Sequence, residues 1–521
     1  MFTYSMPSRR PTTKLCLAAA LATMLAAGSF ALPAHGQDEG GGGGAAAKPN
    51  FLVVVTDDQT LEQMRAMPKT ERFVGRKGTS FTEATVTTPH CCPSRASYLT
   101  GQYAHNHGIL SNKHGYPAFV DPGNVLPVWL QRAGYTTAHL GKFLNGYEKT
   151  VGPITTVAPG WDEWATLLKP RRYLDYELQV NGESVSYGDA KKDYLTSVLT
   201  DRAGRLIRDL APEEKPFYLQ VDHYAPHSGQ GDPSGDCGKY SGAEGAGVRR
   251  YGDKPLPAPE SFNEKDIDDK PVFVQRHNRI SKSGKQRIRA AYRCALASLD
   301  SVDAGIKDLV SELEDAAELD ETVIVFTSDN GYFYGEHRIP GSKTLPYEET
   351  IHVPMMIRLP ESLQGGQRVR EVDQQVANID LAPTILDLAG AEPCNPDSCR
   401  VMDGRSLVPL LEGRGSSFPS DRAVVVELTQ GKDKVKPTLS CSYQGVRTAR
   451  ELYVEHTSVP RPSTRECEEA LEIERYDLRR DPFELENLGE DSTLAARLAG
   501  LRDCNGIPNR DPVPASGAYC E

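Results

Sequence analysis

Four continuous apolar runs constrain the fold of this chain more than any other feature of its sequence. They lie at residues 50–55, 136–140, 217–221 and 323–326. Runs without polar alternation are typical of strands that are buried on both faces. Helical patterns lie between them, most clearly over residues 286–313. This alternation predicts an α/β fold with a large, mostly parallel sheet and helices on both of its faces.

The C-terminal part of the chain follows a different pattern. Gly, Ser and Pro cluster at residues 412–422, as is typical of a boundary between domains. Short alternating segments follow at 423–428 and 451–456, and they indicate a small antiparallel sheet. We therefore expect a catalytic domain over residues 49–415 and a small C-terminal subdomain over residues 416–521.

The first 36 residues have the pattern of an export signal. Arg9 and Arg10 give a basic start, residues 15–32 form an alanine-rich apolar stretch, and a small-residue cleavage site follows. The paired arginines resemble a twin-arginine signal. Residues 37–48 are a Gly/Ala linker. We expect a secreted or extracellular protein, or one held in a periplasm or at the cell surface. The rival interpretation is an uncleaved membrane anchor, which the low hydrophobicity of the stretch disfavours. We expect no membrane association after cleavage.

The net charge excludes one broad class of function. Against 59 Lys and Arg residues the chain has 71 Asp and Glu residues, which gives a formal charge of −12. A general nucleic-acid binder needs an excess of positive charge, so we expect no nucleic-acid partner. An anionic small molecule stays compatible with this charge, because only its pocket must be basic.

Oxygen-bearing side chains follow two of the apolar runs directly. Asp57 and Asp58 come after the first run, and Asp329 and Asn330 come after the run at 323–326. In a doubly wound sheet, ligands gather outside the carboxyl ends of the strands. Each acidic pair taken alone is more often a turn or a helix cap. Taken together, three carboxylates and an amide favour calcium or magnesium over zinc.

The densest motif is Cys-Cys-Pro-Ser-Arg at residues 91–95, followed by Thr-Gly at residues 100–101. It resembles the signature of the type I sulfatases, in which a dedicated formylglycine-generating enzyme oxidises the first cysteine to formylglycine. That cysteine is Cys91 here. The competing interpretations are a buried Cys-Cys pair before a proline turn and half of a zinc site. A zinc site would need a second ligand pair at matching spacing.

The resemblance implies an alkaline-phosphatase-like fold and a specific chemistry. A hydrated aldehyde carries two hydroxyl groups on one carbon. One attacks the sulfur of a sulfate ester, and the other loses its proton so that the aldehyde re-forms and sulfate is expelled. The resemblance further implies one divalent metal, calcium first and magnesium as the alternative. Its expected ligands are Asp57, Asp58, Asp329, Asn330 and the modified Cys91.

Four cationic side chains match the family pattern. A transferring sulfuryl group needs fixed positive charge where negative charge accumulates. Arg95 is expected to bridge the hydrate and the metal-bound carboxylates, and Lys142 and Lys343 to face the sulfate. His227 is expected to donate a proton to the leaving alcohol or to bind sulfate. For an isolated lysine, a solvated surface position would be the default.

One departure from the commonest family pattern narrows the resemblance. Many sulfatases have a histidine two residues after the lysine that corresponds to Lys142, but this chain has Leu144 followed by Asn145. This segment is similar to the branch of N-acetylglucosamine-6-sulfatases and extracellular endosulfatases, as are the doubled cysteine and residues 103–107. Asn145 cannot accept the proton of the hydrate, so the group that does so stays open.

Export permits disulfides. Of the 11 cysteines, Cys16 lies in the expected signal, and Cys92 is expected to be a small buried residue beside Cys91. Connectivity does not follow from sequence alone. The pairs we expect are Cys394 with Cys399, Cys441 with Cys467, Cys504 with Cys520 and, as a guess, Cys237 with Cys294.

The function expected from these patterns is an exported sulfuric-ester hydrolase that acts on a small-molecule or glycan sulfate ester. A phosphonate monoester or phosphodiester hydrolase is the first alternative, because that branch is known to share formylglycine and the fold. An inactive relative that binds sulfated glycans is the remote alternative, since every expected reacting group is present.

Overall fold

The computed structural model describes residues 48–150, 156–229, 250–251, 254–364, 368–430, 434–506 and 520. The expected signal and all but the last residue of the expected linker therefore lie outside the described residues. Lys48–Glu521 forms one compact unit. The boundary that we expect near residue 415 stays a prediction.

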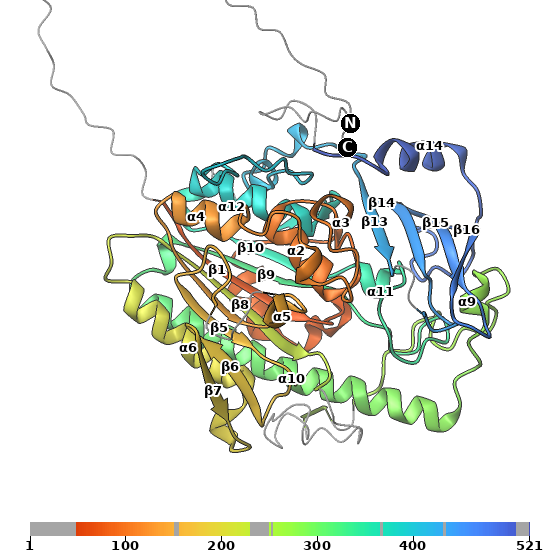
Figure 1. Cartoon of the computed structure of the whole chain (residues 1–521), viewed down its shortest axis with the longest axis horizontal. Coiled ribbons are helices and arrows are strands. Elements are labelled where there is room, and N and C mark those ends of the chain that lie inside the picture. Colours follow the sequence, from red (N-terminus) through yellow and green to blue (C-terminus); the bar gives the residue numbers. More distant parts are fainter. Residues whose placement is uncertain are drawn as a thin grey trace, which may run out of the picture. The chain divides into compact units, whose positions relative to one another are not determined.

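A ten-stranded sheet organises the unit, in the order β11-β2-β10-β9-β1-β8-β4-β5-β6-β7 (Figure 1). Its centre consists of the parallel strands β9, β1, β8, β4 and β5, and the pairings of β6, β7 and β10 are antiparallel. The four apolar runs form β1, β4, β8 and β9, as predicted. The bounds are β1 Asn50–Asp57, β2 Thr79–Phe81, β4 Thr136–Gly141, β5 Glu163–Leu167, β6 Tyr176–Val180, β7 Glu183–Tyr187, β8 Phe217–Pro226, β9 Thr322–Ser328, β10 Met355–Arg358 and β11 Glu371–Val372. A separate two-stranded sheet pairs β3 Ala84–Thr85 with β12 Val376–Ala377.

Helices cover both faces of the large sheet (Figure 1). Successive β1 side chains point to opposite faces, so Phe51 and Val53 lie in one hydrophobic core and Leu52 and Val54 in another. The first core includes α2 (Cys91–Thr100), α4 (Leu126–Arg132) and α12 (Leu381–Ala389). The second includes α6 (Leu195–Leu210) and α10 (Lys282–Asp315), which covers the helix predicted over residues 286–313. In the described part of the chain, no helix is both long and apolar enough to cross a membrane.

The C-terminal residues form the small antiparallel sheet that the sequence predicts. Its order is β13-β14-β15-β16. Arg447 on β14 is 1% exposed and pairs with Glu348 at 2.8 Å, which ties this sheet to the segment that follows β9. The bounds are β13 Ala423–Thr429, β14 Ser442–Thr448, β15 Glu451–Pro460 and β16 Cys467–Asp477, followed by α14 Ser492–Leu501. The short helices are α1 Pro68–Thr70, α3 Ala104–His107, α5 Tyr147–Thr150, α9 Val272–Gln275, α11 Glu348–Ile351 and α13 Val408–Leu411.

Three of the expected disulfides are confirmed. They join Cys394 to Cys399, Cys441 to Cys467 and Cys504 to Cys520. Cys294 is also disulfide-bonded, whereas Cys237, its expected partner, lies outside the described residues, as does Cys16. Cys91 and Cys92 are buried free thiols, as expected for Cys92.

Candidate active site

The start of α2 determines where Cys91 lies. His90 is extended, with φ −152°, and Cys91 is the first residue of the helix. Arg95 lies one turn later, so both side chains project from the same helix face. Gly101 ends the helix in the left-handed conformation, with φ 68°. The motif at residues 91–101 therefore encodes one helix with its terminator, and it buries Cys91 to 1% exposure.

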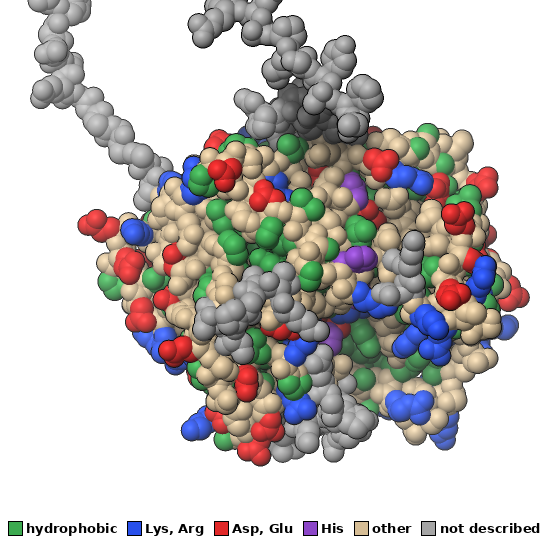
Figure 2. Space-filling view, in the orientation of Figure 1, with side chains coloured by type: hydrophobic (Ala, Val, Ile, Leu, Met, Phe, Trp, Pro, Cys, Tyr) green, Lys and Arg blue, Asp and Glu red, His purple; other side chains and the backbone are tan. Residues whose placement is uncertain are grey.

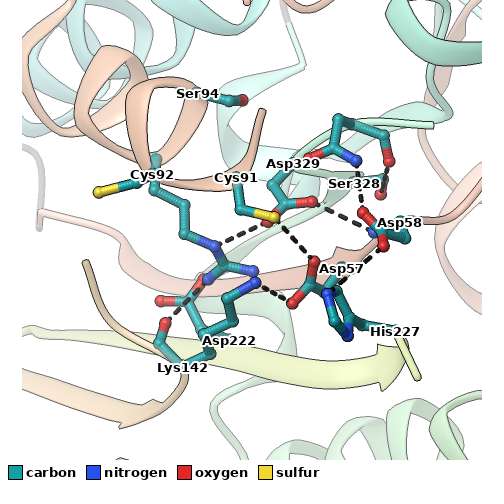
Figure 3. A network of polar contacts seen from close by, with 12 residues as sticks. Asp57, Asp58, Cys91, Cys92, Ser94, Lys142, Asp222, His227, Ser328 and Asp329 are labelled. Atoms are coloured by element: carbon teal, nitrogen blue, oxygen red, sulfur yellow. Dashed lines mark hydrogen bonds and ion pairs between the residues drawn. The ribbon is translucent and has the colours of Figure 1, made fainter. Parts of the chain in front are cut away.

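The carboxyl ends of β1 and β9 deliver the acidic side chains to one place (Figure 3). The strands are parallel, and the Asp329 N–H donates to Thr56 O at 3.0 Å. One ligand atom from each of Asp57, Asp58, Cys91 and Asp329 lies within 4.8 Å of the others. We call these four residues, together with Asn330, the Cys91 cluster. The cluster joins three segments that are far apart in the chain.

The donor set of the Cys91 cluster fits a hard divalent cation. Cys91 Sγ lies 3.2 Å from Asp57 Oδ1, and Asn330 Nδ2 donates to Asp58 Oδ1 at 2.6 Å. Asn330 Oδ1 is buried and has no hydrogen-bond partner among the described residues. A buried amide oxygen without a partner is costly unless something binds it. Carboxylate and amide oxygens are ligands that calcium and magnesium accept.

Three of the four expected cations pair with these carboxylates, and Figure 3 shows the pair of Lys142 with Asp57. Lys142 pairs with Asp57, and Lys343 pairs with Asp58 and hydrogen-bonds to Cys91 Sγ. Arg95 Nε donates to Asp329 Oδ2 at 2.8 Å. Arg95 therefore contacts a carboxylate of the cluster as expected, and its other contacts are to Asp222 and to the Lys142 carbonyl rather than to Cys91.

His227 presents one ring nitrogen to the cluster. Its Nδ1 faces Ser228 O at 2.8 Å, and because a carbonyl can only accept, Nδ1 carries the hydrogen. Its Nε2 lies 3.7 Å from Asp58 Oδ2. Burial lowers the pKa of His227, although the charges of Asp57 and Asp58 oppose this effect. The His227 side chain is 26% exposed and that of Asp58 is 7% exposed, so His227 lies nearer to solvent than the carboxylate it faces.

Burial and charge set the protonation of the remaining groups. Burial, together with the charges of Asp329 and Asp57, raises the pKa of the Cys91 thiol to about 12. Burial and the charge of Asp57 also raise the pKa of Asp329 to about 6. For Asp57 burial acts in the same direction, but Lys142 and other cations outweigh it and hold its pKa below the ordinary range. An unmodified Cys91 is thus a neutral thiol at neutral pH and a poor nucleophile.

Sequence reasoning missed Asp222 on β8. It accepts from Tyr98 at 2.9 Å, lies 2.9 Å from His139 Nε2 and pairs with Arg95 at 3.0 Å. Strand β4 approaches β8 closely at Gly141. A Cβ atom at that position would lie 2.0 Å from Asp222 O, so only glycine fits there. The sequence contained an indication of its role, because Asp222 directly follows the apolar run at 217–221, much as Asp57 follows the first run. Asp222 orients Arg95 from the side opposite Asp329.

The departure after Lys142 has a structural counterpart. The backbone N–H of Asn145 donates to Cys92 Sγ at 3.3 Å, and its side-chain oxygen accepts from Arg171 at 2.9 Å. The Cys92 N–H donates to Asn112 at 2.7 Å. Cys92 and Asn145 therefore connect the start of α2 to the segment after β4.

Comparison with protein families matches two regions of the chain. The sulfatase family matches residues 49–391, and the family described as "N-sulphoglucosamine sulphohydrolase, C-terminal" matches residues 335–503. The first match includes every residue of the Cys91 cluster and each of its expected cations.

Curated relatives are similar over most of the described chain. A putative extracellular sulfatase Sulf-1 homolog from Caenorhabditis elegans is 35% identical over 69% of this chain and 48% of the relative. The N-acetylglucosamine-6-sulfatase of Capra hircus is 31% identical over 88% of this chain and 84% of the relative. The chain thus spans about half the length of the first relative but most of the second.

Solved structures share the fold. One, in complex with its substrate D-glucosamine-2-N,6-O-disulfate, has a TM-score of 0.66 and 23% identity, and the match covers 87% of this chain and 96% of that chain. A phosphonate monoester hydrolase from Silicibacter pomeroyi has a TM-score of 0.64 and 22% identity, over 87% of this chain and 94% of that chain. These two likenesses concern the fold alone. On the family match and the identity to the Capra hircus relative, the chain belongs to the sulfatase family of enzymes.

Proposed function

We propose that this protein hydrolyses a sulfate monoester and that its nucleophile is a formylglycine made from Cys91. The observation that carries the proposal is the position of Cys91 Sγ, which lies 3.2 Å from Asp57 and beside Lys343. The sulfur stands in for the oxygen atoms of an aldehyde hydrate at the same position. Conversion requires a formylglycine-generating enzyme during maturation. The hydrate would supply one hydroxyl as nucleophile and a second to release sulfate.

Asp57, Asp58, Asp329 and Asn330 would hold one divalent cation, calcium first and magnesium as the alternative, with the modified Cys91 as a further ligand. The bound cation would make the hydrate hydroxyl more acidic and offset charge on a sulfate oxygen. The unpartnered Asn330 Oδ1 and the oxygen-rich donor set support this assignment.

The cationic side chains would act directly on the sulfate group. Lys142 is buried at the cluster and Lys343 is only 11% exposed, so their charges act with little screening on the oxygens that gain charge in the transition state. Arg95 would keep Asp329 and Asp222 in place. In its doubly protonated form, which the negative charge of a bound sulfate ester would favour, His227 would donate the Nε2 proton to the leaving alcohol, because that nitrogen faces Asp58 in the cluster.

The substrate that we propose first is a 6-sulfated N-acetylglucosamine, because relatives with that activity are similar over most of their own length. Export is proposed with it, from the expected signal and from the extracellular sulfatase relatives. The visible face in Figure 2 carries interspersed acidic and basic side chains, with histidines gathered near its middle. This face presents no uniform basic field of the kind that would guide a long polyanion.

The test compares turnover of N-acetylglucosamine-6-sulfate, 4-nitrophenyl sulfate and a phenylphosphonate monoester by protein matured with a formylglycine-generating enzyme. We expect turnover of the two sulfate esters and kcat/KM at least about tenfold lower for the phosphonate. Faster phosphonate hydrolysis would transfer the assignment to the phosphonate monoester hydrolases. No turnover of any ester by fully matured protein would favour an inactive relative.

A further inference from the structure

A second cluster of metal-ligating side chains lies outside the site described above. One ligand atom from each of His337, Glu349 and Glu484 lies within 4.8 Å of the others. We call these residues the His337 cluster. His337 and Glu484 are each 0% exposed, so the cluster is inside the protein. Its residues follow β9, begin α11 and follow β16, so it joins the large sheet to the C-terminal sheet.

Each of the three side chains has one buried polar atom that lacks a hydrogen-bond partner among the described residues. His337 Nε2, Glu349 Oε2 and Glu484 Oε1 are buried and make no hydrogen bond within the described residues. The pair His337 Nε2 and Glu349 Oε2 is 3.8 Å apart, which is too long for a hydrogen bond. Three buried polar atoms without partners are costly, and their convergence on one point indicates that something binds there.

The other polar atoms of these side chains are held in place. His337 Nδ1 lies 2.7 Å from Glu264, whose other oxygen is 3.5 Å from Lys270. A carboxylate only accepts, so Nδ1 carries the hydrogen and Nε2 is the nitrogen left to bind a metal, as in a metal-binding histidine oriented by a carboxylate. Glu349 Oε1 accepts from Ser261 at 3.1 Å, and Glu484 Oε2 accepts from the Glu348 N–H at 2.9 Å.

We propose that the His337 cluster binds one zinc ion through His337 Nε2, Glu349 Oε2 and Glu484 Oε1. One imidazole and two carboxylates are a ligand set that zinc accepts, whereas calcium prefers oxygen ligands alone. Zinc bonds of about 2.0 to 2.1 Å put tetrahedral ligands about 3.4 Å apart, so the cluster atoms, which lie within 4.8 Å of one another, would have to move closer by at most about 1.4 Å. A cavity of about 480 Å³ reaches Glu349 and gives the ion a path of entry.

The zinc ion would offset the negative charge that collects there. Glu336 lies next to His337 in the chain and is 6% exposed, with one oxygen accepting from the Tyr334 N–H at 2.6 Å. Arg447, the nearby cation, is already engaged by Glu348. His337 and Glu484 also have left-handed backbones, with φ of 49° and 52°. Backbone strain of this kind is often found at residues that bind a ligand or take part in catalysis. A zinc ion would tie segments that lie about 150 residues apart in the chain.

The direct test is anomalous scattering from crystals of the full-length protein. The protein is stripped with a chelator, dialysed, supplied with zinc chloride and measured on both sides of the zinc absorption edge. We expect an anomalous peak bonded to His337, Glu349 and Glu484, distinct from any ion at the Cys91 cluster. A fully zinc-loaded protein without a peak at the His337 cluster would overturn the proposal. Calcium density there, without zinc, would overturn the choice of metal.

A variant pair gives a second readout in solution. Glu484→Gln keeps the side-chain shape and the acceptor for the Glu348 N–H but removes the ligand charge. Glu486→Gln makes the same change at a nearby exposed glutamate. We expect zinc to raise the melting temperature of the wild type and of Glu486→Gln, and to bind Glu484→Gln at least about 100-fold more weakly. An equal zinc response in all three proteins would contradict the proposal. Should Glu484→Gln fail to fold, the anomalous measurement on the wild type decides.

Discussion

The Cys91 cluster and the His337 cluster are both buried and acidic, but their charges are balanced differently. In the Cys91 cluster each aspartate has a cationic partner, and the unpartnered oxygen is that of Asn330. In the His337 cluster, one polar atom of each side chain makes no hydrogen bond to any residue that the structure describes. The difference indicates that the first is arranged to hold positive charge around a reacting group. The second is arranged to bind a metal ion through its unpartnered atoms.

The largest expected effect is a loss of activity without a loss of stability, on replacing Cys91. Cys91→Ala removes the proposed nucleophile, so kcat should fall by at least about 10⁴-fold with the melting temperature nearly unchanged. Cys92→Ala is the matched control, and it should keep most of the activity. Steady-state kinetics and thermal unfolding check both variants. Activity retained in Cys91→Ala would end the proposed mechanism.

The second largest effect is expected from removing one of the cations that pair with the aspartates of the Cys91 cluster. Lys343→Met keeps the length of the side chain but removes the charge that pairs with Asp58, so kcat should fall about 10² to 10³-fold. Lys307→Met is the control, because Lys307 is exposed on α10. A loss confined to KM would show that Lys343 binds substrate without stabilising the transition state.

The loss of kcat on replacing His227 is expected to depend on how readily the alcohol of the substrate leaves without a proton. In His227→Gln, kcat for N-acetylglucosamine-6-sulfate should fall about 10² to 10³-fold, since a sugar alcohol needs a proton to leave. The loss for 4-nitrophenyl sulfate should be at least about tenfold smaller, because nitrophenolate leaves without one. Equal losses for both substrates would contradict the role of proton donor.

The smallest expected effect concerns the ion pair of His105 and Glu427, which lies outside both clusters and in which the two charges neutralise each other. His105 Nδ1 lies 2.8 Å from Glu427 and its Nε2 lies 2.9 Å from Cys504 O, so both nitrogens donate and the ring is charged. Burial lowers its pKa, but Glu427 and the other acceptors outweigh burial and raise it to about 9. The pair should contribute about 2 kcal/mol to the free energy of unfolding.

Because the folded pKa of His105 is raised, this stabilisation is fully present below about pH 6.5 and is lost as pH rises through about 9. His105→Gln should therefore be less stable than the wild type at pH 6.5 and nearly equal to it at pH 10. Chemical unfolding at both pH values measures the difference. A difference that does not change with pH would contradict a charged His105.

Much of the fold could be predicted because burial leaves a plain pattern. The four runs that lie in the centre of the large sheet are apolar at nearly every position, since both of their faces are covered. Antiparallel strands such as β6 and β7, and the strand β14 of the small sheet, lack such runs. Their pairing depends on neighbours that are remote in sequence, so local pattern did not reveal them.

The candidate site was predictable for the residues that end strands or open α2. Asp57, Asp329 and Cys91 converge as expected, because parallel strands end at one edge. Asp222 was missed because it lies inside β8 rather than at the end of that strand, although it directly follows an apolar run. The His337 cluster was missed for another reason, because His337, Glu349 and Glu484 come from three segments whose packing only the tertiary structure brings together. No local spacing links them.

The most direct test of the account is a peptide mass spectrum covering Cys91, on protein made in a host that contains a formylglycine-generating enzyme. The account predicts loss of the thiol sulfur and gain of an aldehyde, together with its hydrate, at Cys91 alone, while Cys92 stays a thiol. An unmodified Cys91 thiol in protein that hydrolyses sulfate esters at full rate would contradict it.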